Sequence, residues 1–249
     1  MKKVIPLFCC LLSLVIVLAC DDGSGVSSQQ GIGQTAGVSS AAKSVMKFGW
    51  LNEGISKNIV LDENLLRKNI YLVLDCSGSM DGSCDNGKTK IAVAKEAISR
   101  FVGLVPEDTN IGFLTFERSD VQEKIPLGIG NRKELIKAVS LPEANGSTPL
   151  STAVEMGYNK LRFQAEKQLG YGDYYLVIIT DGEANAGYDP SSFVNKILSV
   201  SPVVIYTIGL NIGEGHSLNQ PGRTIYKDAK NPKDLEAGLA EIAAESEKF

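Results

Sequence analysis

The sequence predicts an α/β protein with a doubly wound, mostly parallel central sheet flanked by helices. Short apolar runs alternate along the chain with longer segments of helical periodicity, as strand-helix-strand crossovers require. The strongest apolar runs are continuous, which is typical of strands covered on both faces. With 249 residues, of which 43% are hydrophobic, the chain is long enough to bury such a core.

Local patterns predict each element in turn. Residues 70–74 (Ile-Tyr-Leu-Val-Leu) form an apolar run that predicts the first buried strand. In residues 88–105, apolar side chains recur at helical spacing and predict a helix with one buried face. The same patterns predict strands at 110–116, 121–127 (an edge strand), 174–179, 203–208 and 224–226, and helices at 131–140, 149–168, 190–200 and near 235–242.

Residues 1–19 are expected to be a secretory signal peptide. Lys2 and Lys3 precede an apolar stretch over residues 4–19. A transmembrane anchor is the alternative, but a stretch of this length is marginal for crossing a bilayer. Residues 17–20 (Val-Leu-Ala-Cys) resemble the bacterial lipobox. The resemblance implies that Cys20 is lipidated, becomes the first mature residue and anchors the protein to a membrane.

The segment after the signal divides into a tether and a domain. Residues 20–45 are rich in Gly, Ser and Gln and predict a flexible tether. Residues 46–69 are expected to extend the domain at its N-terminus, for example as a strand along its edge, and residues 70–249 form the domain itself. Asp21 resembles an inner-membrane retention signal, so the expected location is the bacterial cell envelope, facing the periplasm, with the cell surface as the alternative.

Two cysteines remain in the domain, Cys76 and Cys84. In an exported protein they can form a disulfide or remain free thiols, and the disulfide is the expectation. Residues 81–88, which include Cys84, lengthen the connection between the first polar motif and its helix. A disulfide would hold this segment close to the carboxyl end of the strand.

Three polar segments follow strands or precede helices: residues 75–80, 145–150 and 180–183. Because ligands bind at the carboxyl ends of parallel strands, we expect these segments to meet at one edge of the sheet. Together they carry carboxylate and hydroxyl oxygens, which favour Mg²⁺, Ca²⁺ or Mn²⁺ over softer metals. The only histidine, His216, lies in a polar segment and is expected to be exposed, so zinc is not indicated.

The order of these motifs resembles the von Willebrand factor type A domain. Asp-x-Ser-Gly-Ser occupies residues 75–79, Gly-x-Thr-Pro-Leu residues 146–150, and Thr-Asp-Gly residues 180–182, and the resemblance extends over about residues 68–247. Such domains carry a metal-ion-dependent adhesion site on a doubly wound sheet. The resemblance implies five metal ligands, three with hydroxyls and two with carboxylates that bind directly or through water: Ser77, Ser79, Thr148, Asp75 and Asp181.

The resemblance also implies a cofactor and a partner. The cofactor is Mg²⁺, with Mn²⁺ or Ca²⁺ as alternatives, and the partner is a protein that supplies an Asp or Glu carboxylate to the ion. Binding rather than catalysis is therefore expected. A nucleic-acid partner is not, because the net charge is −4 and no basic run occurs within the domain.

Two other function classes compete with this prediction. A haloacid dehalogenase-like phosphohydrolase also places an aspartate at the end of its first strand, but it needs a second acid where Ser77 stands. A serine hydrolase needs a base, and His216 is the only histidine. Both of these would be enzymes; the second class keeps the fold without the metal function, as a scaffold or a substrate-binding lipoprotein.

Overall fold

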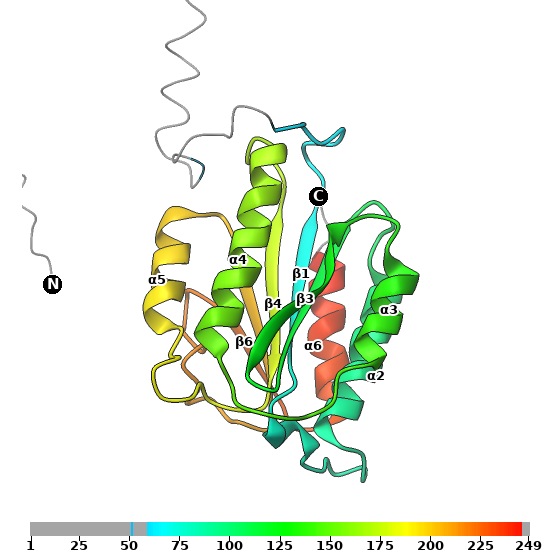
Figure 1. Cartoon of the computed structure of the whole chain (residues 1–249), viewed down its shortest axis with the longest axis vertical. Coiled ribbons are helices and arrows are strands. Elements are labelled where there is room, and N and C mark those ends of the chain that lie inside the picture. Colours follow the sequence, from blue (N-terminus) through cyan, green and yellow to red (C-terminus); the bar gives the residue numbers. More distant parts are fainter. Residues whose placement is uncertain (1–50, 52–58, 246–249) are drawn as a thin grey trace, which may run out of the picture. The chain divides into compact units, whose positions relative to one another are not determined.

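A six-stranded sheet with the strand order β3-β2-β1-β4-β5-β6 runs through the domain (Figure 1). All neighbouring strands are parallel except β3, which pairs with β2 in the antiparallel sense at one edge. The computed structural model describes residue 51 and residues 59–245. The elements are β1 (Asn69–Asp75), η2 (Gly78–Asp81), α2 (Lys90–Leu104), β2 (Asn110–Glu117), β3 (Asp120–Gly128), α3 (Arg132–Ser140), α4 (Leu150–Lys167), β4 (Tyr174–Thr180), α5 (Ser191–Val200), β5 (Val204–Leu210), β6 (Ile225–Ala229) and α6 (Pro232–Glu245).

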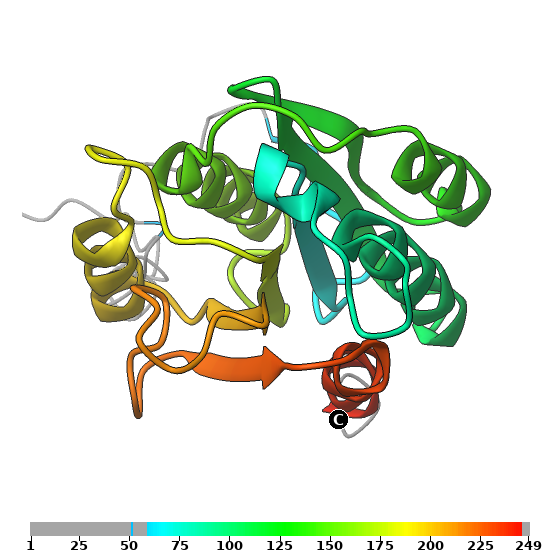
Figure 2. The same cartoon turned by 90° about the horizontal axis from the view of Figure 1, so that it is seen from below.

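Strand β1 is buried along its whole length because helices cover both faces of the sheet. Ile70, Leu72 and Leu74 belong to the core beneath α2, α3 and α6. Tyr71 and Val73 belong to the core beneath α4 and α5. Successive side chains therefore point to opposite faces, as strand geometry requires. Figure 2 shows the two groups of helices on either side of the sheet. The predicted doubly wound, mostly parallel sheet is confirmed.

The sheet reverses its winding direction between β1 and β4. The chain runs from β1 to β2 on one side, and after α4 it returns to β4 on the other side of β1. In doubly wound sheets, the loops that follow two such strands diverge and leave a binding crevice at the carboxyl ends. The loops after β1 and β4 are the first and third polar motifs. Figure 2 views the domain from this end of the sheet.

The edge strand expected within residues 46–69 can be compared with the structure only at residue 51 and over residues 59–69, and elsewhere it stays a prediction. Residues 59–68 contain no strand, and β1 begins only at Asn69. Side-chain oxygens bind the backbone locally instead: Asp62 Oδ1 accepts from Asn64 N at 3.1 Å, and Asn64 Oδ1 accepts from Leu66 N at 3.0 Å. Such turns compete with strand pairing.

The signal peptide, Cys20 and the tether lie outside the described residues, as do residues 46–50 and 52–58. Within the described part of the chain, no helix is long and apolar enough to cross a membrane.

Shortening a buried side chain of β1 should destabilise the domain. Leu72 is fully buried, so Leu72→Ala removes apolar contacts and leaves a cavity that the packed sheet cannot close. We expect the free energy of unfolding to fall by about 2–5 kcal/mol in urea denaturation. The control is Leu66→Ala at an exposed leucine, where the change should stay within about 0.5 kcal/mol. Equal losses in the two variants would contradict the assignment of β1 to the core.

Candidate metal centre

Asp75 is the last residue of β1 and is fully buried. Both of its carboxylate oxygens accept hydrogen bonds, one from the loop that follows and one from the end of β4. Ser77 N donates to Oδ1 at 2.7 Å, and Thr180 Oγ1 donates to Oδ2 at 2.6 Å. Since Thr180 ends β4, this contact joins the first and third motifs across the two central strands.

Asp181 connects the third motif to the hydroxyls of the first. Ser79 Oγ donates to Asp181 Oδ1 at 2.6 Å, and the Ser77 and Ser79 hydroxyls lie 3.0 Å apart. Lys90 Nζ donates to Asp181 Oδ2 at 2.7 Å. Four of the five predicted ligands therefore belong to one group of side chains at the carboxyl ends of β1 and β4.

The second motif lies against the first through its backbone. Gly78 N donates to Gly146 O at 3.0 Å, and Asn145 N donates to Cys76 O at 2.7 Å. Gly146 has a φ of +91°, and a Cβ there would lie 2.6 Å from Ser119 N in the turn between β2 and β3. Only glycine fits this close approach without strain. The packing brings the segment that carries the fifth predicted ligand alongside the first motif.

Thr148 is buried and is held by a residue of the third loop. Thr148 N donates to Asn185 Oδ1, and Asn185 N donates to Thr148 O at 3.3 Å. Asn185 therefore fixes the backbone of Thr148 from both sides. Sequence reasoning missed Asn185 and Lys90 because neither belongs to a motif and both contacts join distant parts of the chain. Thr180 was also missed as a partner of Asp75, although its place directly before Asp181 was a usable signal.

Burial changes the acidity of Asp75. Loss of solvation raises its pKa from the usual 3.8 to about 6, and the nearby charge of Asp181 acts in the same direction. Hydrogen bonds from Ser77 and Thr180 oppose the rise. The ionised carboxylate is thus a high-energy group in the folded protein, and a cation beside it would relieve that cost.

The donor set fits a hard divalent cation. Its members are two carboxylates and three hydroxyls, all oxygen donors of the type that Mg²⁺, Mn²⁺ and Ca²⁺ prefer. No group of three or more His, Cys, Asp or Glu side chains suited to a metal occurs among residues 59–245. Such a group is not required here, because three of the five predicted ligand side chains are hydroxyls.

The expected disulfide between Cys76 and Cys84 is not formed, and both residues are free thiols. Cys76 points into the core beneath β1, where its Sγ lies 3.7 Å from Leu74 O. Burial raises the pKa of this thiol, so it stays protonated. Cys84 lies in a turn that its own backbone closes: Cys84 N donates to Lys88 O at 2.8 Å. Backbone hydrogen bonds therefore close the turn over residues 84–88 without a covalent link.

The prediction that His216 is exposed is wrong, because only 3% of the residue is accessible. Its Nδ1 accepts from Leu218 N at 3.0 Å, which leaves the proton on Nε2 to donate to Gly182 O at 3.1 Å. The ring also stacks against Tyr226, with centroids 5.9 Å apart. His216 thus joins the loop after β5 to the third motif.

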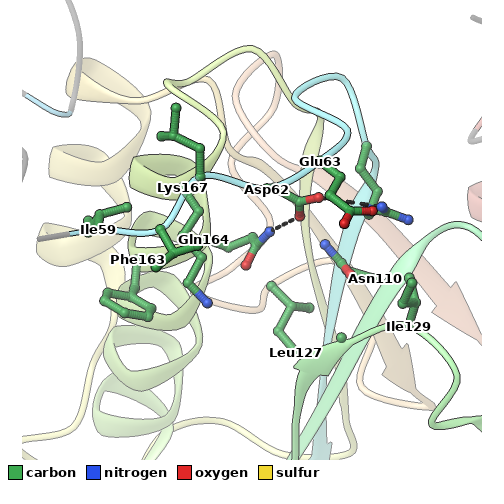
Figure 3. Close-up of a pocket in the computed structure, with 13 residues that line it drawn as sticks. Ile59, Asp62, Glu63, Asn110, Leu127, Ile129, Phe163, Gln164 and Lys167 are labelled. Carbon is green, nitrogen blue, oxygen red and sulfur yellow. Dashed lines mark hydrogen bonds and ion pairs between the residues drawn. The ribbon is translucent and has the colours of Figure 1, made fainter.

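A groove of about 710 Å³ lies at the opposite end of the sheet, where β2 begins (Figure 3). The predicted ligands do not line it. Its polar groups are largely satisfied by one another: Asp62 pairs with Arg67 at 3.4 Å and accepts from Gln164 Nε2 at 2.8 Å. Lys167 Nζ lies 4.8 Å from the centroid of the Phe163 ring. The groove therefore offers no chemistry comparable with that of the metal centre.

Comparison with known proteins agrees with the motif pattern. The family model of the von Willebrand factor type A domain matches residues 69–247. Among curated proteins, the uncharacterized protein YwmC of Bacillus subtilis is 26% identical over 186 residues, which cover 68% of this chain and 79% of YwmC.

Solved structures share the fold at low sequence identity. A von Willebrand factor type A structure from Catenulispora acidiphila has a TM-score of 0.57 at 18% identity, covering 72% of this chain and 43% of that chain. The pilus adhesin SpaC from Lactobacillus rhamnosus GG has a TM-score of 0.59 at 15% identity, covering 75% of this chain and 31% of that chain. This chain spans less than half of either solved protein.

Replacement of Asp75 by its neutral isostere should stabilise the protein in EDTA. Because folding raises this pKa, protonation of the carboxyl group favours the folded state. This contribution to the free energy of unfolding is fully present below pH 3.8 and is lost as pH rises through about 6. We expect Asp75→Asn to raise the free energy of unfolding at pH 7.5 by about 1–3 kcal/mol, and the gain to disappear near about pH 4.

The control for this comparison is Asp189→Asn. Hydrogen bonds from Ser191 lower the pKa of that exposed carboxyl group, so its neutralisation should bring no gain at pH 7.5. Denaturation curves at the two pH values provide the measurement. A less stable Asp75→Asn protein at pH 7.5 would show that burial does not strain the ionised group.

Proposed function

The chain belongs to the von Willebrand factor type A domain family, and we propose that it binds a protein partner through a divalent cation held at the metal centre. The observation that carries the proposal is the hydrogen-bonded group of Asp75, Ser77, Ser79, Thr180 and Asp181 at the carboxyl ends of two adjacent strands. These side chains come from segments about a hundred residues apart. They concentrate oxygen donors where the doubly wound fold places its binding crevice.

Each motif has a separate role in the proposed centre. Ser77, Ser79 and Thr148 would supply hydroxyl ligands, and Asp75 and Asp181 would bind directly or through water. The ion, proposed as Mg²⁺ with Mn²⁺ or Ca²⁺ as alternatives, would supply a positive charge that accepts an Asp or Glu carboxylate from the partner. Buried hydrogen bonds to Asp75 and partly buried ones to Asp181 fix the orientation of both carboxylates in advance.

Binding is favoured over catalysis by the surroundings of Asp75. A phosphohydrolase would use this aspartate as a nucleophile, which requires an accessible oxygen. Here Asp75 is fully buried, and both of its oxygens already accept hydrogen bonds from Ser77 and Thr180. The family likeness to a pilus adhesin supports an adhesive or complex-assembling role for the domain.

We further propose that Cys20 anchors the domain in the bacterial cell envelope. The basis is the signal-like sequence of residues 1–19 and the lipobox-like residues 17–20. Asp21 favours the periplasmic face of the inner membrane. A tether over residues 20–45 would then allow the domain to reach a partner away from the membrane surface.

Partner binding should depend on the metal and on its ligands. The full-length protein, solubilised from envelope in detergent, is expected to retain its partner in Mg²⁺ and to release it in EDTA. Asp75→Ala and Thr148→Ala should abolish retention and weaken Mg²⁺ binding, measured by isothermal titration calorimetry, by at least about tenfold. The folded state of each variant is checked by circular dichroism.

Ser199→Ala provides the matched control, because this exposed hydroxyl donates only to Lys196 O in α5. It should behave like the wild type in both assays. Undiminished partner retention in EDTA by the wild-type protein would contradict a metal-mediated contact.

Removal of the proposed lipidation site should release the protein from the membrane. Cys20→Ser is expected to appear in the soluble fraction of lysed cells, whereas the wild type should sediment with membranes and give a lipid-modified N-terminal Cys20 in mass spectrometry. Cys84→Ser is the control, since it removes a free thiol of the domain and should leave the protein at the membrane. Membrane association of Cys20→Ser equal to that of the wild type would exclude this anchor.

A further inference from the structure

Lys90 is the one cationic side chain that an ion pair in the described structure brings to the metal centre. Its Nζ lies 2.7 Å from Asp181 Oδ2, and the side chains are 18% and 0% exposed. The pair formed two residues earlier in the chain is different in kind. Lys88 and Glu96 are 49% and 48% exposed, so water screens their attraction. The contact of Lys90 with Asp181 is partly buried and is screened much less.

The segment that precedes α2 delivers this lysine to the site. Residues 82–89 form a small hairpin: Ser83 and Thr89 are bridged, and Lys90 N donates to Gly82 O at 2.8 Å. Thr89 Oγ1 then caps α2 by accepting from Ala92 N at 3.4 Å. Lys90 is thereby fixed as the first residue of a helix, and its side chain extends past Gly82 towards the third motif.

We propose that Lys90 is a tethered cation that weakens the hold of the centre on its divalent ion and leaves the occupied centre with a net positive charge. The inference rests on the proposed metal function. Asp75 and Asp181 carry two negative charges when ionised, so a divalent ion alone would bring the centre to zero. With the ammonium group of Lys90 the sum is +1. A partner carboxylate would then bring the charge of the site from +1 to zero. Without Lys90, it would bring the charge from zero to −1.

Coulombic repulsion supplies the physical basis. Lys90 and a bound cation would share the carboxylate of Asp181, so their positive charges would lie within a few ångströms in a partly buried place. At that separation, repulsion is worth kilocalories rather than tenths. The ammonium group also stabilises ionised Asp181 in the absence of the ion. Metal binding must weaken this ion pair, which lowers the affinity for the ion.

Two roles of Lys90 can be distinguished: it could only orient Asp181, or it could also repel the divalent ion. If Lys90 only orients Asp181, its loss should weaken metal binding and stability together. If Lys90 also opposes the ion, its loss should strengthen metal binding while it lowers the stability of the metal-free protein. The two effects then have opposite signs.

The test is titration of the full-length wild type and Lys90→Met with Mg²⁺ by isothermal titration calorimetry, after removal of bound metal. We expect the Kd of Lys90→Met to be at least about tenfold lower than that of the wild type. In EDTA, its thermal midpoint should be lower, because a buried carboxylate loses its counter-ion. Lys90→Gln, which keeps a hydrogen-bond donor without the charge, is titrated as well in case Lys90→Met does not fold. Lys90→Arg keeps the charge and should leave the Kd close to that of the wild type.

Lys88→Met is the matched control, since it removes the same charge two residues away from an exposed pair. Its Kd should change much less than that of Lys90→Met. An unchanged or higher Kd in both Lys90→Met and Lys90→Gln, with Mg²⁺ binding to the wild type intact, would overturn the role of Lys90 alone. Absence of Mg²⁺ and Mn²⁺ binding to the wild type would overturn the metal function and this inference with it.

Discussion

Two carboxylates buried at the ends of adjacent parallel strands set the constraint on which the rest of the site depends. Asp181 lies close enough to Asp75 for its charge to add to the rise in the pKa of Asp75 that burial causes. Ionised groups in this position are costly unless they are paired or hydrogen-bonded. Hydrogen bonds from Ser77, Ser79 and Thr180 and the ammonium group of Lys90 offset part of that cost. The ionised carboxylate of Asp75 lowers the stability of the metal-free fold, and the proposed cation would offset that cost.

Hydrogen bonds between the three motifs keep this arrangement in place. A backbone hydrogen bond joins Gly78 to Gly146, and Asn185 in the loop after β4 binds the backbone of Thr148. His216 adds a further contact to Gly182 from the loop after β5. These hydrogen bonds lie at the carboxyl ends of the strands, while the hydrophobic core lies along the sheet between the helices. The candidate site and the hydrophobic core thus occupy separate regions, which allows loop residues at the site to vary without disturbing the core.

Sequence patterns predicted the parts of the molecule that depend on local order. Continuous apolar runs and helical spacing predicted the strands and helices because these patterns report burial directly. Asp75 and Asp181 could be singled out because each lies at the carboxyl end of a buried apolar run. The roles of Asn185 and Lys90 depend on contacts across many residues, which no local pattern reports. His216 has polar neighbours in the sequence, yet the tertiary structure buries it against Tyr226, and the free thiols of Cys76 and Cys84 likewise depend on where the fold directs each side chain.

The central claim is that oxygen atoms from three separate loops surround one hard cation. Crystals of the domain loaded with Mn²⁺, with anomalous diffraction recorded at the manganese edge, test it most directly. The account predicts a single anomalous peak bounded by the hydroxyl oxygens of Ser77, Ser79 and Thr148, at about 2.0–2.4 Å from its direct ligands. A manganese peak elsewhere, or ordered water alone among these residues in the loaded crystal, would contradict it.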